Sequence, residues 1–426
     1  MLIKRLQLAL IHTAVAMTLV PINSTLNRVM IFDLGISKTL FTLLAIFPYL
    51  LSPIQVAIGS FSDRHPILGY RRSPYILAGL ILCVIGVSVA PMVAILITEN
   101  FTLGVIAGVL AFGAWGMGYN LSAVSYLSLA SELSGEKGRG VTIAVMFIIM
   151  VIGLALTGIS LSAMVPTFDL VALERAFLIV AASALTLGLL GLFKLEPRVN
   201  LSSSPAKADT YTVKQMTAAI TENRVAKIFF VYLLLLLAAL LGQDVLLEPF
   251  GAQAFGMTIG QTSRIISISS GFTLIAFIVA AVLEWWGRIK KKYIAQSGNL
   301  GALIGFITIV ISGLTASQTA FYVGITLLGF GTGFDLTVPE KVGLYIGAWG
   351  FSNGLSRLVG LLMAGVVADL ATQLTGDALH GYLIVFGIEA AMIFLAAVML
   401  YRIDVGAFQR KAHEPAFVDK VAAVAD

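Results

Sequence analysis

Long apolar stretches are the feature of this sequence that most restricts its fold. Of the 426 residues, 58% are hydrophobic and only 12% are charged, whereas a soluble domain has about 25% charged residues. A helix needs about 20 mostly apolar residues to cross a bilayer. Because a chain in lipid must satisfy its backbone hydrogen bonds internally, such stretches form helices or closed barrels. The length and apolar character of these stretches predict an all-α membrane protein.

Twelve stretches are long and apolar enough to be transmembrane helices, and they fall into two sets of six. The first set covers residues 6–31, 39–59, 74–97, 101–130, 141–164 and 175–194, and the second covers 225–247, 263–286, 294–315, 319–337, 342–369 and 380–402. We therefore predict four parts: an N-terminal six-helix bundle (1–195), a cytoplasmic linker (196–224), a C-terminal six-helix bundle (225–402) and a cytoplasmic tail (403–426).

The placement of lysine and arginine predicts the orientation. These residues concentrate near the two termini, in the central linker and in alternate loops. In membrane proteins, the cytoplasmic loops carry an excess of lysine and arginine. Both termini are therefore expected to be cytoplasmic. The net charge of +5 reflects this placement and does not indicate nucleic-acid binding.

The N-terminus also has features of a secretory signal peptide. Lys4 and Arg5 precede an apolar run that contains the small residues Ala14 and Ala16, as in a cleavable signal. The apolar pattern continues to about Phe32, which is long enough to span a membrane. We expect an uncleaved first helix.

The two sets of helices repeat one plan. Residues 108–132 form a glycine-rich helix that runs into a charged turn, and residues 324–341 do the same. Transporters that work by alternating access are built from such repeats, with a site near the membrane midplane. The predicted architecture resembles the major facilitator superfamily, with two pseudo-symmetric six-helix bundles.

Asn27 and Arg28 lie inside the first apolar stretch. A charge at the centre of a membrane helix costs about 2.5 to 3.5 kcal/mol on insertion scales. Such a residue normally faces the interior of a bundle and has a partner. These two residues are the first candidates for a functional site.

Glu248 lies about as deep in the seventh stretch as Arg28 lies in the first. Two interpretations stay open. Either Arg28 and Glu248 form an ion pair or jointly hold a polar ligand, or Glu248 only ends its helix at the interface. Asp244, one turn away, is a second candidate partner of Arg28.

The loop between the second and third stretches has the pattern of a gating loop. It resembles the signature loop of the major facilitator superfamily, in which glycine permits close approach of helices and an acid pairs with a neighbouring helix end. The alternative is an ordinary basic loop on the inner side. The order and position of its residues favour the gating loop, whose candidates are Gly59, Asp63, Arg64, Gly69, Arg71 and Arg72.

Four further polar residues in apolar stretches are weaker candidates. Asn120, Asn353 and Arg357 are expected to line the interior, and His12 is a candidate metal ligand or a donor to a backbone carbonyl. The sequence has no nucleotide-binding loop, no zinc-protease motif and no serine-hydrolase order. We therefore expect no enzymatic activity. The one cysteine, Cys83, excludes a disulfide within the chain.

Four segments in order resemble one branch of the major facilitator superfamily, the bacteriochlorophyll delivery family of PucC/LhaA type. They are Thr25–Met30, Asp63–Ile76, Asp244–Gly251 and Gly347–Gly350. The resemblance extends across both halves of the chain.

The resemblance implies a factor for light-harvesting complex assembly, which delivers or holds chlorophyll or bacteriochlorophyll for antenna or reaction-centre subunits. It also implies an inner, intracytoplasmic or thylakoid membrane of a phototrophic bacterium. The magnesium of chlorophyll accepts one axial oxygen or nitrogen ligand, and Asn27, Glu248 and His12 are the candidates. The same polar residues would also suit a secondary transporter of a small, anionic solute, with Arg28 as its charge partner. A third possibility is a scaffold that binds antenna subunits and transports nothing.

Overall fold

The computed structural model describes residues 1–52, 54–198, 224–286, 289, 291–335 and 346–402. Within these ranges the chain is almost entirely helical and contains no strand beyond an isolated bridge between Ile67 and Tyr70. The predicted all-α class is confirmed. The predicted tail and most of the predicted linker lie outside the described residues.

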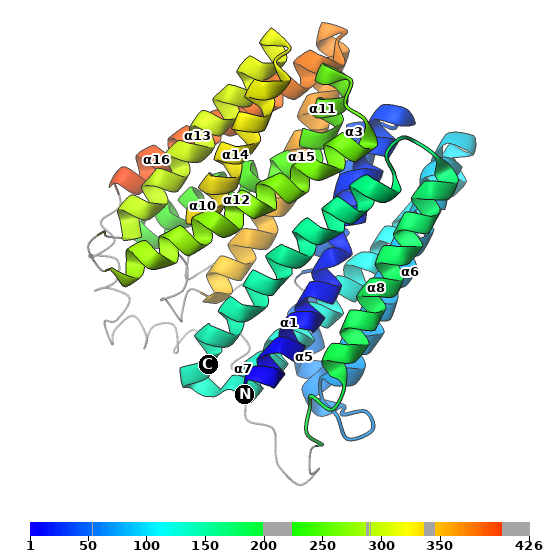
Figure 1. The fold of residues 1–426 in the computed structure, drawn as a ribbon, viewed down its shortest axis with the longest axis vertical. Coiled ribbons are helices and arrows are strands. Elements are labelled where there is room, and N and C mark those ends of the chain that lie inside the picture. Colours follow the sequence, from blue (N-terminus) through cyan, green and yellow to red (C-terminus); the bar gives the residue numbers. More distant parts are fainter. Residues whose placement is uncertain (53, 199–223, 287–288, 290, 336–345, 403–426) are drawn as a thin grey trace. The chain divides into compact units, whose positions relative to one another are not determined.

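The helices follow the chain in the order shown in Figure 1. Their bounds are α1 (Leu2–Met17), α2 (Leu19–Pro21), η1 (Ile22–Leu26), η2 (Val29–Asp33), α3 (Lys38–Ala45), α4 (Phe47–Leu50), α5 (Ile54–Arg64), α6 (Ser73–Glu99), α7 (Phe101–Met164), α8 (Leu170–Leu192), α10 (Arg224–Gly242), η3 (Gln243–Val245), α11 (Leu247–Phe255), α12 (Ile259–Trp285), α13 (Lys291–Thr315), α14 (Gln318–Asp335), α15 (Ile346–Thr375) and α16 (Ala378–Arg402).

Nine helices in the described part of the chain are long and apolar enough to cross a membrane. A tenth span results if the bent pair Phe230–Val245 and Leu247–Phe255 is counted as one. The other two predicted stretches are also helical, but one is divided among α3, α4 and α5, and the other is the short helix α14. The count of twelve spans stays a prediction, and the chain is an integral membrane protein.

The chain divides into two compact units. The first contains Met1–Ala208 and Asp244–Gly271, and the second contains Asp209–Gln243 and Phe272–Asp426. The first unit therefore includes α11 and the beginning of α12, which the sequence analysis assigned to the C-terminal bundle. The predicted division into two six-helix bundles stays a prediction.

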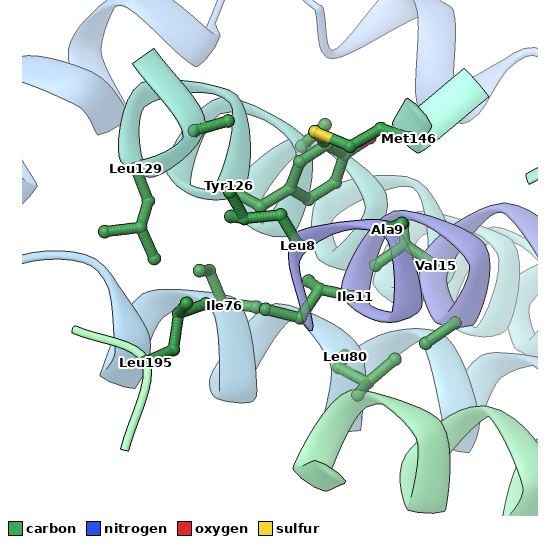
Figure 2. Close-up of a cluster of buried hydrophobic side chains, with 13 residues drawn as sticks. Leu8, Ala9, Ile11, Val15, Ile76, Leu80, Tyr126, Leu129, Met146 and Leu195 are labelled. Atoms are coloured by element: carbon green, nitrogen blue, oxygen red, sulfur yellow. The ribbon is translucent and has the colours of Figure 1, made fainter. Parts of the chain in front are cut away.

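Helix α1 is at the centre of the first unit, where it packs against α7 and α8. Figure 2 shows part of the apolar core around it, in which Leu8 and Ile11 of α1 lie close to Ile76, Leu129 and Leu195. All five side chains are buried. This packing fixes the helix whose continuation carries Asn27 and Arg28.

Short polar side chains set the ends of several helices. The side chain of Asn100 accepts a hydrogen bond from the backbone N–H of Leu103, and Asp169 does the same for Ala172. Such caps satisfy N–H groups that have no partner within the helix. Gly135 interrupts α7 with a φ of 62°, which separates the predicted fourth and fifth spans.

Candidate functional site

The first membrane-crossing helix changes its winding around Asn27 and Arg28. Two π-helical segments, η1 and η2, lie directly before and after these two residues. Pro21, which has no N–H group to donate, precedes η1. Short π-helical turns within α-helices occur frequently at functional sites, and here they set the directions of both side chains.

Arg28 is buried and forms an ion pair with Asp33 through Nη1. Its Nη2 donates a hydrogen bond to the carbonyl oxygen of Met257 at 3.1 Å, and its guanidinium lies 4.9 Å from the ring centre of Phe32. Its Nε has no hydrogen-bond partner among the described residues. Arg28 therefore has a charge partner within its own helix.

The described contacts contain no direct ion pair between Arg28 and Glu248, which was one of the interpretations that the sequence left open. Asp33 lies five residues after Arg28. In an α-helix, residues three and four apart are neighbours, but the π-helical winding of η2 brings the fifth residue to the same side. Asp33 thereby takes the place that the sequence analysis assigned to Glu248.

Glu248 lies in the first turn of α11 and is buried. Its carboxyl group is close to the hydroxyls of Ser24 and Thr262 and interacts electrostatically with Arg28. Its Oε2 atom and the Oγ atom of Ser24 each lack a hydrogen-bond partner in the described part of the chain. Glu248 thus lies near Arg28 without being its main charge partner. Because it is buried, it does not simply end its helix at the membrane interface.

Asn27 connects the first helix to the segment that precedes α11. Its Nδ2 donates to the carbonyl oxygen of Val245 at 2.6 Å and to that of Asn23 at 3.2 Å. The side chain is completely buried, and its Oδ1 has no partner among the described residues. A second tie nearby joins the hydroxyls of Thr25 and Ser263 at 3.1 Å. We call the buried residues Ser24, Asn27, Arg28 and Glu248, together with the partly exposed Asp33 that pairs with Arg28, the buried polar cluster.

The structure does not bring the other predicted residues into this cluster. Asp244 is exposed in η3. Asn120 is buried and donates at 2.8 Å to the carbonyl oxygens of both Pro48 and Gly116, while its Oδ1 accepts from Gln55. These bonds tie α7 to α4 and α5. Arg357 belongs to the second unit, and the side chain of Asn353 lies outside the described residues.

His12 lies in the apolar core of the first unit. Its ring centre is 5.2 Å from that of Tyr126 and 5.1 Å from that of Phe147. Its Nδ1 has no hydrogen-bond partner within the described ranges. The side chain is therefore held by aromatic packing and by a hydrogen bond with the backbone of Met146, in line with the predicted backbone contact.

The predicted gating loop contains an ion-pair network centred on Arg72. The Nη2 atom of Arg72 lies 2.6 Å from Asp63 and 2.9 Å from Glu132, and its Nη1 donates to the hydroxyl of Ser62 at 2.7 Å. Arg72 itself is buried. One guanidinium thus joins α5, the start of α6 and the middle of α7.

Glu196 fixes the same region from the end of α8. Its carboxylate accepts backbone hydrogen bonds from Arg71 at 2.8 Å, from Arg72 at 3.0 Å and from Ser73 at 2.6 Å. These N–H groups form the start of α6, where the helix dipole favours a negative charge. Glu196 therefore caps α6 and attaches the beginning of the predicted linker to it.

The remaining residues of the loop have smaller roles. A Cβ atom at Gly59 would make only an ordinary contact with Val124, so the close approach expected at Gly59 is not present there. Gly69 has a φ of +81°, which a residue with a side chain rarely adopts. Arg64 is exposed. The gating function stays a prediction.

Comparison with known proteins identifies the family. The family model described as "PUCC protein" matches residues 25–408. The chain belongs to the PUCC family. The match covers the buried polar cluster apart from Ser24, the Arg72 network and both units.

Two relatives match this chain over more than nine tenths of their own lengths. The chain is similar to "Protein PucC" of Cereibacter sphaeroides, with 27% identity over 93% of this chain and 91% of the relative. It is also similar to "Bacteriochlorophyll synthase 44.5 kDa chain" of Rhodobacter capsulatus, with 22% identity over 92% and 93%. Among solved structures, the nucleoside transporter NupG has a similar fold, with a TM-score of 0.70 at 17% identity over 94% of this chain. This confirms the predicted major facilitator-like fold.

Three acids that form key contacts in this PUCC protein were not predicted from the sequence. They are Asp33, Glu132 and Glu196, which partner Arg28, Arg72 and the start of α6. Glu132 and Glu196 each follow an apolar stretch at its inner end, where the basic loop is predicted to lie. That position was a usable signal. The spacing of Asp33 was not, because it depends on the π-helical winding.

Proposed function

We propose that this PUCC protein takes part in the assembly of photosynthetic complexes by delivering or holding chlorophyll or bacteriochlorophyll. The family match over residues 25–408 carries the proposal. The name of one relative, "Bacteriochlorophyll synthase 44.5 kDa chain", supports the connection with this pigment class. The proposed partners are the bilayer, the pigment and antenna or reaction-centre subunits.

The chemistry of the buried polar cluster is compatible with a pigment. Magnesium is a hard cation that prefers oxygen ligands, and imidazole nitrogen is a general metal ligand. Asn27 Oδ1, Glu248 Oε2 and His12 Nδ1 each have an unused electron pair among the described contacts. The cluster also lies in largely apolar surroundings, as expected for a site that takes an apolar ligand with few polar groups.

We further propose a membrane of a phototrophic bacterium as the location, with both termini on the cytoplasmic side. The protein would act by binding and transfer, without catalysing a reaction. The absence of catalytic motifs from the sequence supports the second statement. The basic residues at the inner ends of the apolar stretches support the orientation.

Deletion of the gene in a phototrophic host tests this function. The deletion strain should have weaker antenna absorbance per cell, with the loss restored by the wild-type gene on a plasmid. Normal antenna absorbance in the deletion strain under several light intensities would contradict the proposal.

Secondary transport of a small solute is a second candidate. The bend of 51° between the helices before and after Leu246, together with buried charges at this depth, favours it. Discontinuous helices form the substrate sites of many transporters. Arg28 is a poor anchor for an anionic solute, however, because Asp33 already compensates its charge. A transporter would leave antenna spectra normal, whereas a scaffold without transport would lower them without binding pigment.

A further inference from the structure

The loop between α5 and α6 has an exposed apolar tip. Leu68 is 85% exposed and Ile67 is 47% exposed, and no other large apolar side chain in the described ranges is as exposed as Leu68. Figure 1 shows this loop at the end of the first unit where the N-terminus lies. Single exposed apolar residues are common on protein surfaces, but this leucine is held in a backbone conformation that leucine rarely adopts.

A tight turn fixes that conformation. The backbone N–H groups of Ile67 and Tyr70 each donate to the carbonyl oxygen of the other residue at 2.9 Å. Between them, Leu68 has a φ of 54° and Gly69 a φ of 81°, as in a type I′ turn, whose first central position favours asparagine, aspartate or glycine. Leucine in this conformation is strained, and its side chain meets water. A contact outside the chain that favours leucine would offset both costs.

The base of the loop lies at the boundary of the membrane. The apolar run of α6 begins at Pro74, directly after the basic residues Arg71 and Arg72, and such a change marks the end of a span. The hydroxyl of Tyr75 donates to the carbonyl oxygen of His65 at 2.6 Å, which ties the start of the loop to α6 at this level. The loop is therefore fixed next to the lipid headgroups.

The tip cannot lie far from these headgroups. Leu68 is three residues after His65, and a fully extended chain of that length covers at most about 11 Å. The turn folds the chain back, so the actual separation is smaller. The headgroup layer is about 5–8 Å thick on each side of a bilayer. Leu68 is thus within reach of this layer.

Basic side chains accompany the tip. Arg64 and Arg198 are exposed, and the guanidinium of Arg198 lies 5.8 Å from the ring centre of Tyr70. The two nearby acids are already engaged, since Asp63 pairs with a buried arginine and Glu196 accepts backbone hydrogen bonds at the start of α6. The surface beside the tip is therefore positive, which complements anionic lipid headgroups.

We propose that Ile67 and Leu68 insert into the headgroup layer of the membrane and that Arg64 and Arg198 bind anionic phospholipid beside them. Apolar side chains next to basic ones are typical of segments that bind at a membrane interface. Docking of a partner protein would require the tip to stand clear of the lipid, and the shortness of the loop opposes this. The contact does not depend on the proposed pigment function.

The test places a fluorescent label at the tip through Leu68→Cys. The full-length protein is reconstituted in vesicles of phosphatidylcholine and phosphatidylglycerol. The wild type controls for labelling, because its one cysteine, Cys83, is buried. Pro197→Cys is the matched control, since Pro197 is exposed next to Arg198, and Ile85→Cys on the exposed face of α6 gives the signal of a label inside the bilayer. Quenching is measured with a lipid that carries a nitroxide near the top of its acyl chain and with acrylamide in the water.

The lipid nitroxide should quench the Leu68 label about as strongly as the Ile85 label, whereas acrylamide should quench mainly the Pro197 label. Quenching of the Leu68 label by acrylamide alone would overturn the proposal. A Leu68 label that neither reagent quenches lies against protein, which would overturn it as well. Equal quenching by lipid at Leu68 and Pro197 would show that the label itself causes insertion, with the same consequence.

A second measurement tests the choice of anionic lipid. In the labelled Leu68→Cys protein, Arg198→Gln should lower the ratio of inserted to water-exposed tip about fivefold, which corresponds to about 1 kcal/mol for one basic residue near an anionic surface. In vesicles of phosphatidylcholine alone, the same substitution should have no effect. An equal effect in both kinds of vesicle, or no effect in either, would overturn the assignment of anionic phospholipid.

Discussion

Replacing Arg28 with glutamine should destabilise the protein more than replacing its partner Asp33 with asparagine. Arg28→Gln removes the positive charge that pairs with Asp33 and acts on the buried Glu248. Removing one member of a buried ion pair costs about 3–5 kcal/mol. The Asp33 side chain is 16% exposed, so water relieves part of the cost and we expect about 3 kcal/mol.

Asp33→Asn should cost less because Arg28 keeps two other interactions. Its Nη2 still donates to the Met257 carbonyl, and Glu248 still acts on its charge. The loss is then close to that of one hydrogen bond to a charged group, about 2 kcal/mol. The double variant Arg28→Gln, Asp33→Asn leaves only Glu248 without its charge partner and should cost about 3 kcal/mol. The two single losses together exceed this value by about 2 kcal/mol, which is the expected coupling energy.

The assay is urea unfolding of the purified protein in detergent micelles, followed by circular dichroism. Arg264→Gln serves as the control, since Arg264 is an exposed arginine of the same unit whose Nε donates to Ser162. Its loss should stay below about 1 kcal/mol. If the losses from Arg28→Gln and Asp33→Asn simply add in the double variant, the two residues are not coupled and the charge assignment is wrong.

Three further predictions concern packing and the inner loop. Arg72→Gln should cost about 2 kcal/mol in the same unfolding assay, because it releases two partly exposed acids and the Ser62 hydroxyl from one buried guanidinium. Glu196→Gln should cost about 1–2 kcal/mol and increase proteolysis near the start of the linker, since a neutral amide accepts the three N–H groups less strongly. Gly360→Ala should lower the melting temperature because its Cβ would collide with the backbone of Ala238, whereas Gly387→Ala, with nothing within 4 Å, should not. Equal melting temperatures for the two alanine variants would refute the packing argument.

Much of the fold followed from the lengths of the apolar stretches. Every predicted span is helical in the described structure, because a long apolar run in lipid must form its own hydrogen bonds. The breaks were harder to predict. The boundary between α10 and α11 lies within one predicted span, and so do the two π-helical segments of the first helix.

The sequence predicted which residues belong to the site more successfully than it predicted which of them contact one another. Asn27, Arg28 and Glu248 do lie together in the first unit, because buried polar groups in a membrane segment gather where they can satisfy one another. Their partners depend on local winding, which apolar periodicity does not specify. Asn120 shows the same limit. From the sequence, an asparagine in an apolar helix that binds a ligand cannot be distinguished from one that, as here, ties helices together.

The absorbance spectrum of the purified wild-type protein tests the central claim most directly. The protein would be expressed with an affinity tag in a phototrophic host and purified in mild detergent, with an unrelated tagged membrane protein of similar size as the control. The account predicts chlorophyll or bacteriochlorophyll bands that exceed those of the control at equal protein concentration. A spectrum no more pigmented than the control, from cells that are actively assembling antenna complexes, would contradict it.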